Sequence, residues 1–427
     1  MAHVAERLAD WAAESRSRPL EAAVLHHAKR AVIDWHAAFY PGSVVTPATL
    51  LEKAFPGELG HVRTRALIMG AAAHTEEVDD IFRDGIYHPG APTISAALAV
   101  AQSLNLSGMD FLRAVVVGYE ISTRIGAAMG RAHYKYWHNT GTIGWFGACA
   151  AVSEALKLNK QQFAHALATV TTFAAGLQQA FRMDSMSKPL HAGRAAEAGV
   201  TAALAAREGV TGSLDVIEGF GKAMGDDPDW EAAFATLGRD FHITRMTFKN
   251  HACCGHTFAA IDGALALKAR MKIAAEEIER IRVGTYRAGV EVAHYETPRT
   301  PAEGRFSLKY VVATALTHGS VRLAAFESSR LEDAQTKALM GKISVAIDPE
   351  LDANFPRQRA ARVVIEARGG EREEFLQPTR KGDPDMPLTD REVDEKYMEL
   401  VTPILGAGEA KGLLARLWKL EALPQLP

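Results

Sequence analysis

The chain has 427 residues, of which 48% are hydrophobic and 23% charged, and its formal net charge is -3 at pH 7. These values are typical of a soluble globular protein, and the length predicts two or three domains. Because lysine and arginine are scattered rather than clustered, the composition argues against a nucleic-acid or anionic-membrane partner. We therefore expect a small-molecule ligand.

The N-terminal segment and the cysteines indicate a cytoplasmic protein. Residues 1–8 lack a basic segment followed by an apolar one, and no run of 18 apolar residues occurs anywhere in the chain. Three cysteines, Cys149, Cys253 and Cys254, are compatible with a reducing compartment. They lack the C-x-x-C spacing of iron–sulfur ligands, so we expect no such cluster.

Apolar residues recur at three- and four-residue intervals through most of the first 245 residues, which predicts a large all-helical domain. The segments are rich in alanine and glycine and poor in β-branched residues, a composition that favours closely packed helices. The predicted helices cover 4–40, 46–55, 66–81, 93–104, 109–126, 145–156 and 161–181.

Residues 74–92 place an acidic segment between two apolar runs, 66–73 and 93–100. A carboxylate at the end of such a run is costly to bury unless it is paired or hydrogen-bonded, so a polar cleft is expected here. The segment contains five carboxylates: Glu76, Glu77, Asp79, Asp80 and Asp84.

If the helix continues to Ile81, then His74, Glu77 and Asp80 line one of its faces. His88 would follow in a turn and face a carboxylate, which can fix the tautomer of an imidazole and raise its basicity. Two alternatives remain open. The carboxylates could form a solvated helix end, or His74 and Glu77 could ligate one ion, although no second histidine at a known spacing completes a metal set.

A polar, aromatic loop at 133–147 leads into the helix predicted at 145–156. Residues 139–142 offer capping groups and free backbone N–H donors that suit a bound carboxylate, and His138 adjoins them. The alternative is a capping loop with an aromatic plug. No nucleotide-binding glycine motif accompanies it.

A second loop is predicted at 182–194, where Lys188, His191 and Arg194 surround Pro189. Cations grouped before an apolar helix suit an anion, although a solvated helix start would also place them there.

The pattern changes after residue 245. A polar cluster at 248–257 opens a helix to about Met271, and alternating segments then predict strands at 278–292, 342–347 and 361–367. Gly369-Gly370 is typical of a hairpin, and helices are predicted at 307–318 and 331–341. We expect a helical domain in 1–245, a smaller α+β domain in 246–382, and a helical return in 383–427, where Thr389 begins a capping box.

Five motifs, in this order, resemble the MmgE/PrpD family, which includes 2-methylcitrate dehydratase, cis-aconitate decarboxylase and iminodisuccinate epimerase. The resemblance covers nearly the whole chain. The motifs are His-Thr-Glu-Glu-Val-Asp-Asp at 74–80 with His88-Pro89, Trp-His-Asn-Thr-Gly-Thr at 137–142, Ser-Lys-Pro-Leu-His at 187–191, Lys249 with Cys253-Cys254 and His256-Thr257, and Phe-Ser-Leu-Lys-Tyr at 306–310.

The resemblance implies a mainly α fold, with a large all-helical domain, a smaller α+β lid domain and the active site in the cleft between them. It also implies a homodimer, a small di- or tricarboxylate substrate, and a reaction that needs neither metal nor organic cofactor. The implied catalytic residues are Glu77, His88, His138, Lys188, Lys249 and Tyr310. The implied substrate-binding residues are Asp80, Asn139, Thr140, His191 and Arg305.

One departure concerns Glu77, since several relatives have aspartate there, and the spacer to His88 is one residue longer here. The family reactions share a step at the carbon next to a carboxylate, where Lys188 and Lys249 would stabilise developing negative charge. We expect His88, oriented by Glu77 or Asp80, to be the general acid or base, with His138 or Tyr310 serving the opposite face.

A lyase is the leading expectation. An epimerase of the same family would instead need two groups of matched pKa on opposite faces, and His88 with His138 would be such a pair. A non-catalytic protein that binds small anions is the alternative from another class. It would keep its ligand affinity nearly intact without His88.

Overall fold

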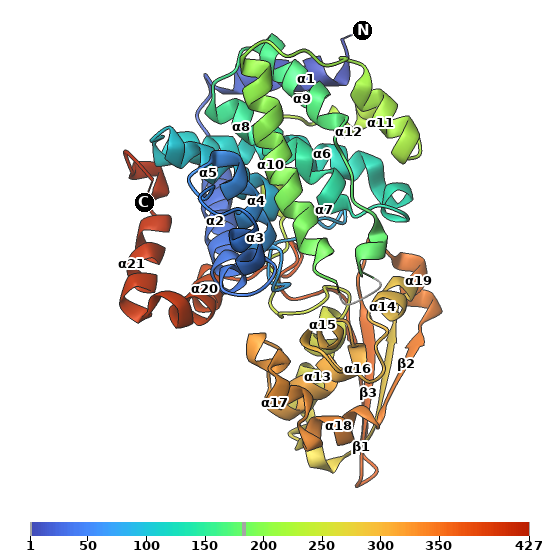
Figure 1. Cartoon of the computed structure of the whole chain (residues 1–427). Helices are drawn as coiled ribbons and strands as arrows, with labels where there is room; N and C mark the ends of the chain where they lie inside the picture. Colours follow the sequence, from blue (N-terminus) through green and yellow to red (C-terminus); the bar gives the residue numbers. More distant parts are fainter. Residues whose placement is uncertain (1, 182–184, 427) are drawn as a thin grey trace. The chain divides into compact units, whose positions relative to one another are not determined.

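The computed structural model of the chain describes residues 2–181 and 185–426. The fold is mainly helical with one small mixed sheet of four strands (Figure 1), as the sequence predicts. Contacts divide the chain into two compact units. The helical unit comprises 1–75, 79–247 and 389–427, and the α+β unit comprises 76–78 and 248–388.

The helical unit carries the first twelve helices and the last two. Their bounds are α1 Val4–Ser15, α2 Ala22–Ser43, α3 Ala48–Ala54, α4 Val62–Ala73, α5 Gly90–Ser103, α6 Gly108–Tyr134, α7 Asn139–Thr142, α8 Gly144–Ala155, α9 Lys160–Thr171, α10 Ser187–Arg207, α11 Val216–Met224, α12 Trp230–Phe234, α20 Asp390–Leu405 and α21 Ala407–Leu417. In the described part of the chain, no helix is long and apolar enough to cross a membrane.

Small residues allow these helices to pack closely, as their composition predicts. The contact between α4 and α10 shows this best. A Cβ atom built on Gly193 of α10 would lie 2.3 Å from the Leu67 carbonyl oxygen of α4, and one on Gly70 would lie 2.9 Å from the Gly193 Cα. The two backbones therefore touch, and only glycine fits at this crossing.

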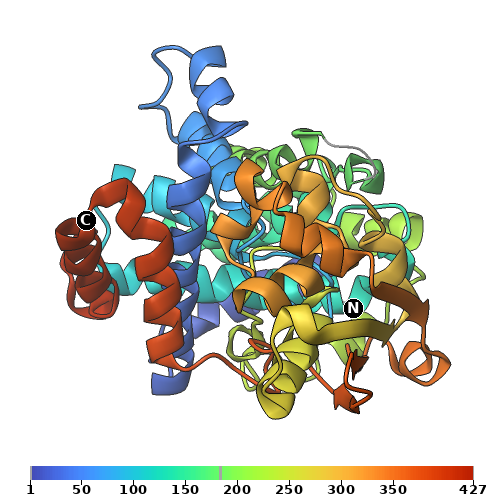
Figure 2. The ribbon, with the colours of Figure 1, turned by 90° about the horizontal axis from the view of Figure 1, so that it is seen from below.

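The C-terminal helices belong to the helical unit. Thr389 starts α20 with the predicted capping box, accepting a hydrogen bond from the Glu392 amide. Within α20, Lys396 makes a fully buried ion pair with Asp34 of α2, with 2.6 Å between Nζ and Oδ1. Figure 2 shows α20 beside α2, so a charge pair and apolar packing hold the end of the chain.

The α+β unit places helices around the sheet, whose strand order is β2-β1-β3-β4. Strands β1 and β2 are parallel, whereas the β1–β3 and β3–β4 pairs are antiparallel, the latter through the predicted Gly369-Gly370 hairpin. The bounds are α13 Phe258–Met271, β1 Ile278–Thr285, α14 Arg287–Val292, α15 Pro301–Arg305, α16 Leu308–His318, α17 Ser328–Leu331, α18 Ala334–Met340, β2 Ile343–Ile347, α19 Pro349–Asn354, β3 Ala361–Ala367 and β4 Arg372–Gln377.

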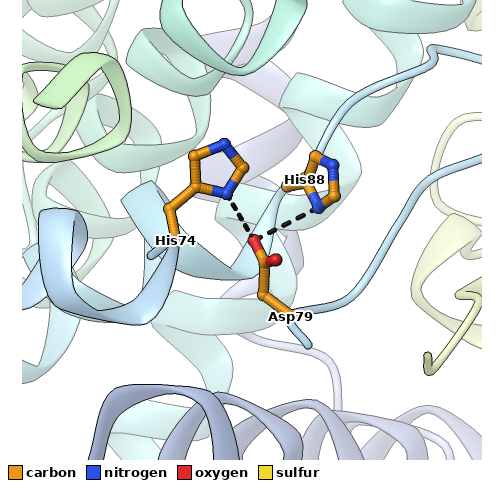
Figure 3. A group of neighbouring side chains, drawn as sticks. All are labelled: His74, Asp79 and His88. Carbon is orange, nitrogen blue, oxygen red and sulfur yellow. Dashed lines mark hydrogen bonds and ion pairs between the residues drawn. The ribbon is translucent and has the colours of Figure 1, made fainter. Parts of the chain in front are cut away.

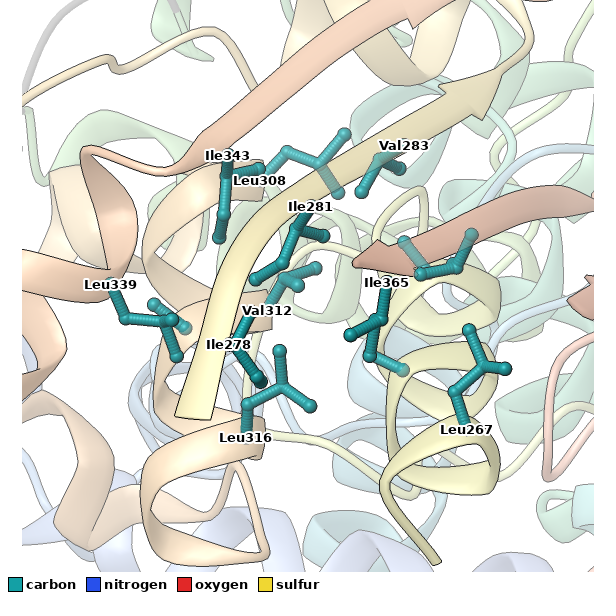
Figure 4. Close-up of a cluster of buried hydrophobic side chains, with 14 of the residues drawn as sticks. Leu267, Ile278, Ile281, Val283, Leu308, Val312, Leu316, Leu339, Ile343 and Ile365 are labelled. Atoms are coloured by element: carbon teal, nitrogen blue, oxygen red, sulfur yellow. The ribbon is translucent and has the colours of Figure 1, made fainter. Parts of the chain in front are cut away.

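The core of this unit lies between the sheet and helices α13, α16 and α18 (Figure 4). A register shift between Ile278 and Arg280 lets Ile278 and Ile281, three residues apart, both enter the core. Val283 resumes the alternation and packs in the same cluster. Strand β1 is therefore the centre of the unit.

Several predicted element boundaries are wrong. Helix α4 ends at Ala73 instead of Ile81, because Glu77 has a positive φ of 56° that a helix does not allow. The helix predicted over 161–181 ends at Thr171, since Gly176 has a φ of 135° and Leu177 forms a bridge with Trp137.

Other predicted elements are divided or extended. The helix predicted over 4–40 is two helices, α1 and α2, and α2 continues through Pro41 to Ser43. Helix α6 runs to Tyr134, past the predicted end at 126. The strand predicted over 278–292 ends at Thr285, and α14 follows it.

The loop predicted at 182–194 is mostly helix. Helix α10 begins at Ser187, so Lys188 and His191 lie in its first turns. Pro189 is accommodated there because the first N–H groups of a helix have no intrahelical partner. Residues 182–184 of that predicted loop lie outside the described residues.

Candidate active site

The loop between α4 and α5, residues 74–89, carries most of the predicted site residues of the helical unit. It begins at His74, which caps α4, and ends at Pro89, which caps α5. Two backbone bridges brace the loop, one from Ile81 to Thr247 and one from Phe82 to Tyr87. The segment is thus an ordered loop built on two helix ends.

Asp79 holds two histidines at once (Figure 3). Its Oδ2 atom lies 2.7 Å from His74 Nδ1, in a hydrogen bond, and 3.2 Å from His88 Nδ1, an ion-pair distance without hydrogen-bond alignment. Asp79 and His74 are buried, whereas the His88 side chain is 16% exposed. His88 is therefore the member of the group that retains access to solvent.

Two further histidines extend this cluster. His138, at the start of α7, stacks on His74 with 5.4 Å between ring centroids. Its Nδ1 lies 2.9 Å from Nδ1 of His191 in α10. Since one of these nitrogens must donate and the other accept, the pair requires at least one neutral imidazole with a defined tautomer.

Burial keeps the inner histidines neutral. Desolvation lowers the pKa of His74 to about 3, against the opposing effect of Asp79, and lowers the pKa of His138 well below 6.5. Burial and then the Lys188 charge lower the pKa of His191. Lys188 also lowers the pKa of His74, so its ammonium group lies close enough to affect the cluster.

Asp80 faces away from these histidines. Its Oδ1 accepts the Gly90 N–H of α5 at 2.9 Å, and its Oδ2 accepts the Tyr119 hydroxyl of α6 at 2.7 Å. Burial, and then the negative charge of Asp34, raise the pKa of Asp80 to about 7. Asp80 therefore anchors the loop to two helices, and the expectation that it orients His88 is wrong, because Asp79 occupies that place.

Asn139 and Thr140 contribute to the same region through the loop. The Asn139 side-chain amide donates to the Gly85 carbonyl at 2.8 Å, and the Thr140 hydroxyl accepts the His88 backbone N–H at 3.1 Å. Both residues are fully buried. The Asn139 Oδ1 atom has no hydrogen-bond partner within the described residues, so it is an acceptor available to a ligand.

A second group of predicted residues lies in the α+β unit. Lys249 donates through Nζ to the Glu77 backbone oxygen at 3.0 Å and to Glu77 Oε2 at 3.1 Å. Both side chains are buried, and the positive φ of Glu77 allows its carbonyl and carboxylate to meet the same ammonium group. Glu77 therefore pairs with Lys249, and its predicted contact with His88 is replaced by that of Asp79.

Arg305 and Tyr310 also lie in the α+β unit. Arg305 makes an ion pair with Glu76, and its guanidinium carbon lies 5.3 Å from the centroid of the Phe326 ring. Tyr310 is buried, with its hydroxyl donating to the Ala325 carbonyl. Proton transfer by Tyr310 would require this hydrogen bond to break. That these residues share one site with the histidine cluster stays a prediction.

The histidine cluster also offers a donor set for a metal ion. His74, Asp79 and His88 each present a ligand atom within 4.8 Å of the other two. Two histidines and one carboxylate are a known combination for divalent iron. However, His74 Nδ1 and Asp79 share a proton in a 2.7 Å hydrogen bond, and an ion would have to displace that proton. The same residues therefore offer either a metal-ligand set or a carboxylate that orients two histidines.

The chain belongs to the MmgE/PrpD family. The sequence profile of the MmgE/PrpD N-terminal domain matches residues 6–233, and that of the MmgE/PrpD C-terminal domain matches residues 251–420. Together these matches cover most of the chain. They confirm the resemblance drawn from the five motifs.

The relatives that this chain matches include proteins named as decarboxylases and dehydratases. The cis-aconitate decarboxylase-like protein oryM of Aspergillus oryzae is 29% identical, over 94% of this chain and 91% of its own. Human cis-aconitate decarboxylase is 25% identical, over 84% of this chain and 76% of its own. The 2-methylcitrate dehydratase of Escherichia coli K12 is 24% identical, over 63% of this chain and 52% of its own.

The predicted site residues did not include Asp79, although the structure places it between His74 and His88. A helix through Ile81 puts Glu77 and Asp80 on one face with His74, and that prediction does not include Asp79. Its spacing of five residues from His74 suits a carboxylate that returns to a helix C-terminus through a loop. The positive φ of Glu77, which redirects the chain, has no clear signal in a non-glycine residue.

Proposed function

We propose that the protein is a lyase that removes CO2 from a small tricarboxylate of the cis-aconitate type. The observation that carries the proposal is the pairing of Asp79 with His88 beside neutral, buried histidines. The coverage of the relatives supports decarboxylation over dehydration, since the decarboxylases match 84–94% of this chain and the Escherichia coli dehydratase 63%.

In this proposal His88 is the proton donor. When the bond to the departing carboxylate breaks, its electron pair stays on carbon and spreads toward the remaining carboxylates. The protonated His88 ring then delivers a proton to that carbon, and Asp79 stabilises its imidazolium form. Water later restores the proton. This role suits the one histidine of the cluster that keeps an exposed edge.

Lys188 is the proposed anion-binding residue of the helical unit. Its charge reaches His74 and His191 and would stabilise substrate carboxylates and the electron density that develops on them. In α7, Asn139 Oδ1 would accept a hydrogen bond from a protonated carboxyl group. Lys249, paired with Glu77, is proposed to be a second cation at the substrate.

His138 is proposed to contact the substrate as a neutral imidazole, held by its hydrogen bond with His191. Burial favours the neutral form, because it lowers the pKa of His138. Residues Asp80, Tyr310 and Arg305 are proposed to hold the site in shape, given the hydrogen bonds and ion pairs that already engage them.

The test incubates the protein with cis-aconitate, 2-methylcitrate or iminodisuccinate in D2O. Each reaction is monitored by proton NMR, and CO2 is measured in parallel. We expect CO2 from cis-aconitate, and one deuterium in the dicarboxylate product. Loss of water from 2-methylcitrate without CO2 would favour a dehydratase instead. Exchange of an α proton of iminodisuccinate without breakdown would favour an epimerase, and binding of these acids without any reaction would favour a non-catalytic anion-binding protein.

Metal dependence is tested in the same assay. Since the proposed proton transfer by His88 uses side chains alone, we expect full activity after dialysis against EDTA. The metal content of the purified protein is measured by mass spectrometry before and after dialysis. Activity lost with a stoichiometric divalent ion, and restored with it, would assign His74, Asp79 and His88 as metal ligands.

A further inference from the structure

A cavity of about 430 Å³ lies within the helical unit, lined by residues of α2, α3, α4, α5, α6 and α21. None of the predicted site residues lines it. Its volume falls in the range of about 300–1,000 Å³ that small-molecule sites occupy. Figure 1 labels the helices concerned.

Aromatic and aliphatic side chains form much of the lining of this cavity. Trp35 and Phe39 of α2 stack face to face with 4.9 Å between centroids, and Leu98 of α5 and Leu413 of α21 join them. His36 is buried in the same wall and donates through Nδ1 to the Val32 carbonyl at 2.8 Å, so its ring is satisfied as a neutral species. Burial lowers the pKa of His36 to about 4. An alkyl or aryl body suits this lining.

Arg65 marks one end of the cavity, whose lining also includes one further arginine and two glutamates. Of the charged side chains that line it in the described part of the chain, only Arg65 of α4 is partly buried, whereas Glu52, Glu409 and Arg416 are exposed. Arg65 donates to the Gln102 side chain, and its other N–H groups have no protein partner among the described residues. A planar carboxylate matches those remaining donors.

A polar hollow of about 310 Å³ adjoins the cavity at this end. It shares Arg65, Gln102 and Leu426 with the cavity and adds Asn105 and Gln425, whose side chains hydrogen-bond each other at 2.7 Å. The combined space is therefore apolar on one side of Arg65 and polar on the other. This arrangement distinguishes the two ends of an amphipathic molecule.

We propose that this cavity is a binding site for an amphipathic monocarboxylate, with its hydrocarbon body against Trp35 and Phe39 and its carboxylate on Arg65. The site is separate from the histidine cluster but is built on the same helices. Arg65 and Met69 line it from α4, which ends at His74, and Leu98 lines it from α5, which begins after His88. Met69 lies about 8 Å along the helix axis from His74. An occupied cavity therefore bears on the loop that carries Asp79.

The proposal is tested by calorimetric titration of the full-length protein with decanoate, and with decan-1-ol as the uncharged counterpart. We expect decanoate to bind, and Arg65→Gln to weaken binding by about tenfold or more through loss of a charge-assisted hydrogen bond. The matched control is Arg63→Gln, on the exposed face of the same helix, which should bind as the parent does. Equal affinity for decan-1-ol would overturn the assignment of a carboxylate.

A second pair of variants tests the location. Met69→Trp fills the cavity and should abolish binding, whereas Met386→Trp, exposed in the α+β unit, should not. Leu413→Trp fills the same cavity from α21. It replaces Met69→Trp in the test if circular dichroism shows that Met69→Trp is not folded. No binding to the parent protein, or unchanged binding in both filled variants, would overturn the proposal.

Two further readouts are decisive. Hydrogen exchange in residues 74–89 should slow when decanoate binds, because α4 and α5 carry both ends of that loop; unchanged exchange on binding would overturn the link to the cluster. The oligomeric state of the filled variants is measured by light scattering. If Met69→Trp and Leu413→Trp both dissociate an oligomer, and the parent does not bind decanoate, a second copy of the chain occupies the cavity instead.

Discussion

Asp79 defines the candidate site at the scale of single residues, since one carboxylate oxygen serves two imidazoles. A single acceptor atom fixes both rings relative to each other. The negative charge of Asp79 raises the pKa of His74, against the larger effect of burial. We therefore propose that Asp79 is a positioning residue.

Asp79→Asn should lower kcat by about 10²–10⁴-fold while the fold is retained, because the amide keeps the size but loses the charge that stabilises the His88 imidazolium. The measurement is kcat and KM at a fixed pH, and kcat should fall while KM changes little. The control is Asp84→Asn, an exposed carboxylate that forms an ion pair with Arg83. Unchanged kcat in folded Asp79→Asn would contradict the positioning role.

Asp80 predicts a dependence of stability on pH. Its folded-state pKa is raised to about 7 from 3.8, so the folded state holds a proton that the unfolded state releases between these values. The stability contributed by protonated Asp80 is therefore present at low pH and is lost as the pH rises through about 7, by at most about 1.4 kcal/mol per pH unit.

Asp80→Asn removes this titration and should become progressively less destabilising, relative to the parent, as the pH rises from 4 to 8. The asparagine amide can still accept from Gly90 and donate to the Tyr119 oxygen. Urea unfolding of both proteins at several pH values measures the difference. A difference that is constant over this range would show that Asp80 is ionised throughout.

At the scale of elements, the helices and strands followed from the sequence better than the loops did. The period of the apolar residues identified α5, α6 and α8, and alternation with a Gly-Gly turn identified β3 and β4. The errors came at ends. The chain leaves α4 at Ala73 although the following residues keep a helical spacing, because the backbone turns at Glu77.

That error determined how much of the site could be predicted. Motif order located His88, His138, His191 and Lys188, which the structure brings together in the helical unit. The partner of His88 could not be predicted, because which of five carboxylates faces inward depends on one backbone angle. Similarly, Lys249 was expected near substrate, and only the fold reveals that Glu77 is its ion-pair partner.

Close packing of α4 on α10 gives the clearest stability prediction for an element. Gly193→Ala places a Cβ 2.3 Å from the Leu67 carbonyl oxygen, so the helices must separate, at a cost of about 1–3 kcal/mol. Gly219→Ala in α11 is the matched control, since a Cβ there meets nothing within 4 Å. It should stabilise the protein slightly, by about 0.4–1 kcal/mol. The melting temperatures of both variants are measured by thermal unfolding. Equal melting temperatures would contradict a requirement for glycine where α4 and α10 touch.

Because α4 also carries His74, Gly193→Ala should lower activity at temperatures where the variant is still folded. A shift of the helix by a few tenths of an ångström moves one member of the cluster relative to the others. Gly219→Ala should leave activity unchanged.

At the scale of the whole molecule, the fold and the chemistry are separate questions. Family membership follows from matches along most of the chain, and the mainly helical fold with one small sheet agrees with it. The reaction depends on a few side chains, because one scaffold can host decarboxylation, dehydration or epimerisation. The arrangement around Asp79 is compatible with a proton donor held on one side, which is what decarboxylation requires.

The most direct test of this account is release of CO2 from cis-aconitate by the parent protein, His88→Gln and the control His61→Gln, an exposed histidine that precedes α4. We predict that the parent and His61→Gln release CO2 at the same rate, and that His88→Gln is slower by about 10²-fold or more while its melting temperature is unchanged. Parent-like CO2 release by folded His88→Gln would contradict the central role of His88. Absence of CO2 from all three would contradict decarboxylation of this substrate.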